Sequence, residues 1–161
     1  MIARKREIFL LLDNIRSVHN VGSIFRTAET AGISHIYCLD TTPVPIDRFG
    51  RKRSDFAKVA LGAENMIPWE HIPEAGTLLK SLKKDGFEIV ALEQNERSVD
   101  YKMVELKCSK VLVILGNEVE GVSKDLLKSA DVVAEIPMQG DKESLNVSVA
   151  AGIFLYRLFD R

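Results

Sequence analysis

Short apolar runs alternate with helix-like segments along the chain, and this alternation restricts the fold more than any other feature of the sequence. Each run has the length of a strand and is mainly apolar, as in strands that are buried on both faces. The runs cover residues 8–12, 35–39, 66–69, 87–92, 110–115 and 132–136. Segments with helical spacing lie between or after them, at 21–31, 73–84, 123–129 and 146–159. Alternating strands and helices predict an α/β fold, with a mostly parallel sheet and helices on both faces.

The length and composition predict one compact domain over residues 1–161. Hydrophobic residues make up 46% of the chain, yet no apolar run approaches the ~20 residues of a membrane span. The first residues have no cleavable signal pattern, so a cytoplasmic location is expected. Cys38 and Cys108 lie in or beside apolar runs and are expected to be buried free thiols. The scattered histidines have no ligand spacing, so no metal site is expected.

The net charge of −1 argues against a generally basic nucleic-acid binder, but the charge is unevenly distributed. Residues 1–60 hold ten Lys and Arg against six Asp and Glu, so they carry +4 and the remainder carries −5. The segment from 40 to about 55 is too long for a simple connector, which favours a functional loop. Its basic residues, which could attract phosphate or form only a solvated loop, are Arg48, Arg51, Lys52 and Arg53.

Polar residues gather where the predicted strands end, which is where parallel α/β sheets bind ligands. Asn20 is expected to cap the helix after the first strand, and Arg26 on that helix can reach back over the same loop, unless it pairs on the helix surface. After the fifth strand, Gly116 and Gly121 enclose Glu118. Gly116 would allow close approach of a ligand, and Gly121 would permit a tight turn. Without the ending of a phosphate-binding loop, this turn suits a neutral or cationic ligand, or the orientation of an arginine.

A third polar group precedes the last predicted helix. Ser144 and Asn146 are residue types that satisfy the free N–H groups at a helix start. The helix behind them is apolar almost all round, which predicts burial on more than one face. Ile136 and Met138, in the loop before it, would form apolar walls suited to an adenine ring.

Read in chain order, these segments resemble the three motifs of the SpoU-type RNA ribose 2′-O-methyltransferases, which belong to the knotted SPOUT superfamily. The resemblance extends from residue 8 to residue 158. It rests on Asn20 with Arg26, Leu115-Gly116-Asn117-Glu118 with Gly121, and Ile136-Pro137-Met138 followed by Ser144-Leu145-Asn146-Val147-Ser148-Val149-Ala150.

The resemblance implies a C-terminal deep trefoil knot, although chains in general avoid knots. It also implies S-adenosyl-L-methionine as the cofactor, and a homodimer that forms through the knotted region and the last helix. The residues implied to hold the cofactor, mainly through their backbone, are Leu92, Gly116, Ile136 and Leu145, with Met138 in the same wall. The implied catalytic residues are Arg26, Asn20, Glu118, Ser144 and Asn146.

The implied substrate is RNA. A short chain of one domain, without a separate RNA-binding domain, resembles the smaller tRNA-modifying members, so tRNA is favoured over rRNA. RNA recognition would then rest on the catalytic domain and its basic loop, residues 48–58. The alternatives are a catalytically silent RNA- or cofactor-binding module on the same fold, and a knotted enzyme that methylates a base. A flavodoxin-like nucleotide-binding protein is disfavoured, because residues 14–20 contain no glycine.

The implied reaction depends mostly on positioning, together with stabilisation of the developing alkoxide. Because arginine resists deprotonation, we expect Arg26 to stabilise the alkoxide rather than to act as a base. Asn20 and Glu118 are expected to hold its guanidinium, and Ser144 and Asn146 to orient the ribose.

Overall fold

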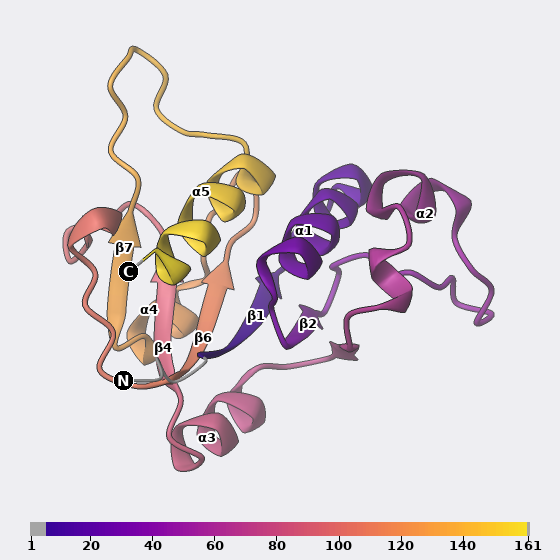
Figure 1. Cartoon of the computed structure of the whole chain (residues 1–161), viewed down its shortest axis with the longest axis horizontal. Helices are drawn as coiled ribbons and strands as arrows, with labels where there is room; N and C mark the ends of the chain where they lie inside the picture. The colour runs from indigo at the N-terminus through magenta and orange to yellow at the C-terminus, as the bar shows by residue number, and fades with distance from the viewer. Residues whose placement is uncertain (1–5, 161) are drawn as a thin grey trace.

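The computed structural model describes residues 6–160 and contains a seven-stranded sheet in the order β3-β2-β1-β6-β4-β7-β5 (Figure 1). All neighbouring strands in it run parallel, which confirms the predicted α/β class. The strands are β1 (Glu7–Asp13), β2 (His35–Leu39), β3 (Trp69–Ile72), β4 (Glu88–Leu92), β5 (Val99–Asp100), β6 (Lys110–Leu115) and β7 (Val132–Glu135).

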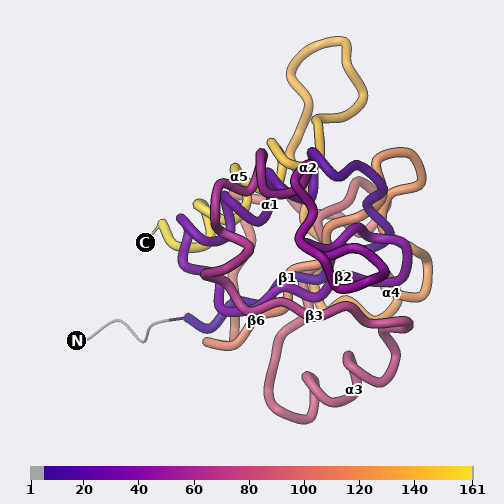
Figure 2. Tube along the Cα trace, turned by 90° about the vertical axis from the view of Figure 1, so that its right-hand side faces the viewer, coloured from indigo at the N-terminus to yellow at the C-terminus, as the bar shows by residue number. Residues whose placement is uncertain are grey.

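Helices cover both faces of this sheet, as predicted (Figure 2). Phe25, Phe56 and Phe154 are fully buried in one core, where α1, α2 and α5 pack on the sheet. Leu79 and Leu126 belong to the opposite core, under α3 and α4. The helices are α1 (Val18–Ala31), α2 (Ser54–Ala60), α3 (Gly76–Lys84), α4 (Lys124–Ser129) and α5 (Val147–Phe159), with 3-10 turns η1 (Ala63–Asn65) and η2 (Tyr101–Met103).

The strand order reverses between β1 and β6, which lie side by side at the centre of the sheet. In register, Leu12 of β1 pairs with Leu115 of β6, and Leu115 pairs in turn with Leu92 of β4. The loops that follow these strands therefore leave the sheet at one edge. Such a switch point is where open parallel sheets form their ligand crevice.

The start of α1 differs from the prediction. Ser17 caps this helix, because its hydroxyl accepts a hydrogen bond from the N–H of Asn20 at 3.1 Å. The predicted capping role of Asn20 is therefore wrong, and its side chain is left to make other contacts. Gly32 ends the helix in the left-handed conformation, with φ of 78°.

Several short elements depart from the sequence prediction. Helix α2 begins within the predicted basic loop, where no helix was expected, and it ends at Leu61 in left-handed backbone, directly before Gly62. Strand β3 begins at Trp69, where the predicted strand ended, and Met66 is exposed. Strand β5 has only two residues, too few to form a pattern.

The two cysteines lie in different environments. Cys38 is buried in β2, and burial raises the pKa of its thiol to about 12. Cys108 is exposed, so its predicted burial is wrong. It lies before β6, whose continuous buried run begins only at Val111.

Helix α5 is buried along one face and exposed along another. Its buried face holds Ala151, Phe154, Leu155 and Leu158. Its other side exposes apolar residues, namely Val149, Ile153, Tyr156 and Phe159. The predicted burial on more than one face is therefore not achieved by one copy of the chain. Within residues 6–160, no helix is both long and apolar enough to cross a membrane. The trefoil knot stays a prediction.

Candidate active site

A cavity of about 540 Å³ opens beyond the carboxyl ends of β4, β6 and β7. Its far wall is the loop at 136–146, which rises from β7 and returns to the start of α5 (Figure 1). The predicted cofactor residues Leu92, Gly116, Ile136, Met138 and Leu145 all line it. The cavity is also lined by Glu93, Gln94, Leu115, Asn117, Glu118, Val119, Gly121, Glu135, Glu143, Ser144, Asn146, Val147 and Ala150.

The turn after β6 closes tightly on itself. The N–H of Asn117 donates to the carbonyl of Gly121 at 3.0 Å, and the N–H of Gly121 donates back at 2.9 Å. Gly121 has the positive φ that was predicted, at 71°. A Cβ at Gly116 would lie 2.2 Å from the nitrogen of Val122. The position that a Cβ would take at Gly116 is thus filled by the chain's own turn, while Gly116 also lines the cavity.

Asn117 holds this turn from inside. Its side chain is buried, and its Oδ1 accepts from the N–H of Val119 at 2.8 Å and of Glu120 at 3.0 Å. Its Nδ2 donates to the carbonyl of Asn14 at 2.6 Å, which ties the turn to the loop after β1. Asn117 was not among the residues predicted to have a role of their own. An asparagine directly after a glycine in a short turn was the available signal, since asparagine often satisfies nearby backbone groups.

A chain of hydrogen bonds joins the three predicted motifs. Asn20 Nδ2 donates to Glu118 Oε1 at 3.0 Å. Asn146 Nδ2 donates to Asn20 Oδ1 at 3.1 Å. Asn146 Oδ1 in turn accepts from the N–H of Ser148 at 2.9 Å and caps α5 as predicted. The start of α1, the turn after β6 and the start of α5 are therefore linked through side chains.

The carboxylate of Glu118 determines which groups donate and which accept in these hydrogen bonds. Burial raises the pKa of Glu118, but hydrogen bonds from Asn20 and from the N–H groups of Arg16 and Ser17 outweigh that effect and place the pKa below its ordinary value. An ionised carboxylate only accepts hydrogen bonds, so Asn20 must present its amide nitrogen to Glu118. Its oxygen then faces Asn146, which must donate in turn.

The cavity lining is acidic. Its carboxylates are Glu93, Glu118, Glu135 and Glu143, and no Lys or Arg is among the lining residues. Both carboxylate oxygens of Glu93 accept hydrogen bonds from backbone N–H groups, those of Gln94 and Val122, each at 2.8 Å. Uncompensated carboxylates repel phosphate and attract cations. The lining therefore fits a cationic ligand such as a sulfonium compound, and it does not fit a nucleotide phosphate.

Arg26 lies outside this cavity. It is exposed on α1 and lines a separate depression between α1 and α2, together with His19, Ser23, Thr27, Thr30, Lys58, Val59 and Leu61. Within the part of the chain that is described, it makes no hydrogen bond or ion pair with Asn20 or Glu118, whose side chains bind each other. The expected grip of these two residues on its guanidinium is therefore absent in one copy of the chain. Ser144 does line the cavity.

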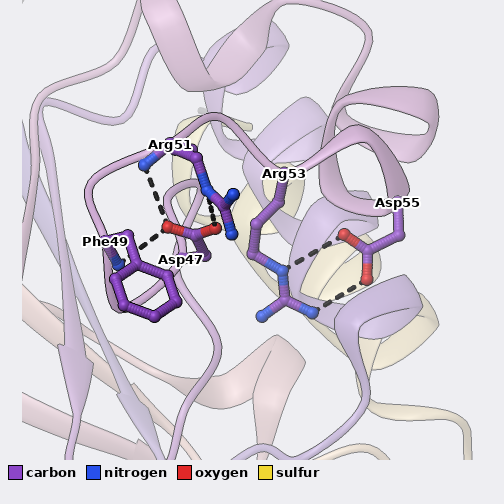
Figure 3. Close-up of polar contacts among 5 residues, drawn as sticks. All are labelled: Asp47, Phe49, Arg51, Arg53 and Asp55. Atoms are coloured by element: carbon purple, nitrogen blue, oxygen red, sulfur yellow. Dashed lines mark hydrogen bonds and ion pairs between the residues drawn. The ribbon is translucent and has the colours of Figure 1, made fainter.

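The basic loop contains basic residues that form ion pairs (Figure 3) and basic residues that form none with any described residue. Arg51 pairs with Asp47 and Arg53 pairs with Asp55, each with a nitrogen–oxygen distance of 2.8 Å. Arg48 and Lys52 have no acidic partner among residues 6–160. The four basic residues predicted to bind RNA are thus close together, but two of them stabilise the loop itself. No cluster of potential metal ligands occurs in the described residues.

Comparison with known proteins assigns the chain to a family. Residues 7–156 match the sequence model of the SpoU rRNA Methylase family. The chain belongs to this family. The SpoU match covers the turn between Gly116 and Gly121, the hydrogen bonds among Glu118, Asn20 and Asn146, and most of α5.

Two relatives show how far the SpoU similarity extends. The tRNA (guanosine(18)-2'-O)-methyltransferase of Aquifex aeolicus (strain VF5) is 33% identical over 153 residues, which are 95% of this chain and 69% of that protein. A TrmH family protein of Staphylococcus saprophyticus is 33% identical over 156 residues, which are 96% of this chain and 59% of that protein.

A solved structure of an rRNA methyltransferase is similar to the chain over nearly its whole length. The AdoMet-bound rRNA methyltransferase from Sinorhizobium meliloti superposes with a TM-score of 0.84 at 30% identity. The superposition covers 96% of this chain and 56% of that one. This chain therefore spans little more than half of that protein, and about two thirds of the Aquifex relative.

Proposed function

We propose that this chain is an S-adenosyl-L-methionine-dependent methyltransferase that modifies a ribose 2′-hydroxyl of RNA, with tRNA as the substrate rather than rRNA. The observation that carries the proposal is the hydrogen-bonded chain from Glu118 through Asn20 to Asn146, at the rim of an acidic cavity. The name of the Aquifex relative states the same reaction on tRNA, and the Sinorhizobium relative binds the same cofactor.

The cavity residues fit the cofactor chemically. The backbone around Leu92, Gly116 and Leu145 would hold it, with Ile136 and Met138 against its adenine ring. The carboxylates of the lining would offset its positive charge. When bound, S-adenosyl-L-methionine supplies a methyl group on a sulfonium sulfur, which is already a good leaving group.

The protein must then position the hydroxyl and stabilise the charge that develops on it. We assign that stabilisation to Arg26, because a guanidinium keeps its proton and can donate to an alkoxide. Asn20 and Glu118 hold the start of α1, and Asn146 holds the start of α5. Ser144, on the cavity wall, would contact the ribose.

A second copy of the chain would bring Arg26 to a cavity. Helix α5 leaves an apolar face open, with Val149 49% and Tyr156 52% exposed. The same helix packs on α1, where Gly152 lies beside Thr27 of the Arg26 depression. In a homodimer formed through this face of α5, the second copy would thus lie close to both the Arg26 depression and the cavity wall. We therefore propose that Arg26 of each copy acts at the cavity of the other.

Transfer of labelled methyl groups tests the reaction. The protein is incubated with labelled S-adenosyl-L-methionine and either unmodified tRNA or rRNA, and the product is digested with alkali. Label in alkali-resistant dinucleotides supports ribose methylation, and the RNA that accepts it identifies the substrate class. Label in mononucleotides would indicate base methylation instead. Cofactor binding without label in either RNA would favour a catalytically silent module.

Arg26→Ala tests the assigned stabiliser. We expect turnover to fall about 10²–10³-fold, the usual loss for one transition-state donor, with unchanged cofactor affinity by calorimetry. Lys80→Ala, on α3 at the opposite sheet face, is the control. Lost cofactor binding in Arg26→Ala would contradict the assignment.

Mixed dimers test where Arg26 acts. Arg26→Ala is co-expressed with Ile136→Arg, a variant whose side chain fills the cavity. Each variant alone should be inactive. A mixed dimer regains activity only if the Arg26 of one copy serves the cavity of the other, and an inactive mixed dimer would place Arg26 at its own cavity.

A further inference from the structure

Phe49 stands at the tip of the basic loop, and the residue is 67% exposed (Figure 3). By contrast, Phe25 and Phe56 are fully buried and pack edge-to-face with centroids 5.0 Å apart. Phe49 therefore contributes its ring to a surface rather than to the core. Exposed aromatic rings beside positive charges are features of surfaces that bind single-stranded nucleic acid.

The loop tip is ordered by Asp47. The carboxylate oxygen Oδ1 of Asp47 accepts from the N–H of Phe49 at 2.8 Å and of Arg51 at 3.0 Å. Its Oδ2 accepts from the guanidinium of Arg51 at 2.8 Å. The backbone of Asp47 also pairs with that of Arg51, and the Ile46–Lys52 bridge closes the loop. Phe49 is thus presented on a preformed loop, so little ordering entropy is lost when a partner binds.

Two guanidinium groups lie against the ring. The Arg48 carbon Cζ is 4.8 Å from the ring centroid and that of Arg51 is 5.0 Å. Arg51 is held by Asp47, whereas Arg48 has no acidic partner in the described chain. The guanidinium of Arg48 can therefore move from the Phe49 ring to a phosphate. A face of the ring is then free to stack on another flat group. Lys52, also without an acidic partner there, adds a second phosphate-binding charge.

We propose that Phe49 stacks on an unpaired base of the RNA substrate, while Arg48 and Lys52 contact the adjoining phosphates. This inference rests on the proposed function, since it takes RNA to be the substrate. A duplex hides the faces of its bases, so a stacking ring selects a loop, a bulge or an end. Arg51 and Arg53 act differently, because their ion pairs hold the loop in shape. Phe49 would then help to determine which RNA nucleotides the enzyme accepts.

The ring is tested with Phe49→Ala, Phe49→Leu and Phe49→Trp, using an unmodified tRNA transcript as the probe. Stacking on one base is worth about tenfold or more in affinity. We expect the RNA affinity of the Ala and Leu variants to fall by about that factor, and their KM for RNA to rise by the same factor. The Trp variant should keep the wild-type values of both. Calorimetry should give the same cofactor affinity for all of them. Met66→Ala, which removes an equally exposed side chain outside the loop, is the matched control.

The charges are tested by salt dependence. Arg48→Ala and Lys52→Ala should each reduce the slope of log affinity against log salt by about 0.7–0.9, the value for one phosphate contact. Slopes that match the wild type in both variants would overturn the phosphate contacts.

Three results would overturn the stacking role: wild-type RNA affinity in Phe49→Ala, wild-type affinity in Phe49→Leu alone, or a changed oligomeric mass in Phe49→Ala. The second would mean an apolar contact without stacking, and the third a protein interface. These failures are separable from failure of the proposed function. If the protein transfers methyl groups and the Phe49 variants have the wild-type KM for RNA, only the stacking role is wrong. If RNA binding weakens in the Phe49 variants but no methyl group is transferred, only the proposed enzymatic function is wrong.

Discussion

Asn146 donates a hydrogen bond from its side-chain nitrogen to the side-chain oxygen of Asn20, across 126 positions of sequence and over 3.1 Å. This bond joins the first and the last of the three motifs directly. Both amides are oriented by Glu118, which can only accept. A charge or donor change at any of the three positions should therefore affect the other two.

Asn20→Asp should destabilise the fold, because it places a second carboxylate against Glu118. The loss of the Asn20 donor and the repulsion together should lower the free energy of unfolding by about 1–3 kcal/mol at neutral pH. Urea unfolding of both proteins measures the difference. Asn95→Asp is the control, because within residues 6–160 the side chain of Asn95 makes one hydrogen bond, in which its Oδ1 accepts from the N–H of Arg97, and an Asp oxygen can accept in the same way. Equal effects of the two substitutions would refute the role of the network.

Glu118→Gln should change the acid dependence of stability. The folded-state pKa of Glu118 is lowered, so its charge stabilises the protein fully at pH values above the ordinary 4.5. That contribution is lost as the pH falls through the lowered value. The wild type should therefore melt a few degrees above Glu118→Gln at pH 7, and the gap should close in acid. A gap that stays constant down to strongly acidic pH would contradict the lowered pKa.

Gly116→Ala should damage the cavity. The added Cβ would lie 2.2 Å from the Val122 nitrogen and 2.3 Å from the Gly121 carbonyl carbon, so the turn must open. Forced repacking of this kind costs about 1–3 kcal/mol, and we expect cofactor affinity to fall at least tenfold. Thermal melting and calorimetry measure the two effects. Gly140→Ala is the matched control, because a Cβ there meets nothing within 4 Å.

The cysteines should differ in reactivity. Cys108 is exposed and should react with a thiol reagent within minutes in the native protein. Cys38 is buried with a pKa of about 12, so its thiolate is scarce at neutral pH and it should react only on unfolding. Native protein should thus titrate as one thiol and urea-unfolded protein as two. Two fast thiols in the native state would contradict the burial of Cys38.

The long apolar strands were predictable from the sequence. Strands β2 and β6 have the predicted bounds, because an uninterrupted apolar run in a parallel sheet has few alternatives. Helix α2 was missed, because it has only seven residues and no side chain caps its start, although Gly62, directly after Leu61, was a signal for its end. Local pattern cannot detect an element that is held mainly by tertiary packing of a residue such as Phe56.

The cavity wall was also predictable, since all five cofactor positions line it. The partners of the polar residues were not. Ser17 took the capping role expected of Asn20, which left Asn20 to bind Glu118. Arg26 lies on another surface because a helix turns between positions 20 and 26, and a spacing of six residues does not place both side chains on one face. Spacing identifies such residues without showing which of them touch.

The way in which α5 closes the cavity has a consequence for synthesis of the protein. Ser144, Leu145, Asn146, Val147 and Ala150 form one wall, and the bond that secures them reaches back to Asn20. A chain that has emerged from the ribosome only as far as β7 has every strand of the sheet but an open cavity. We therefore expect a nascent chain to bind no cofactor until α5 has docked. Cofactor binding can then serve as a marker for the docking of α5.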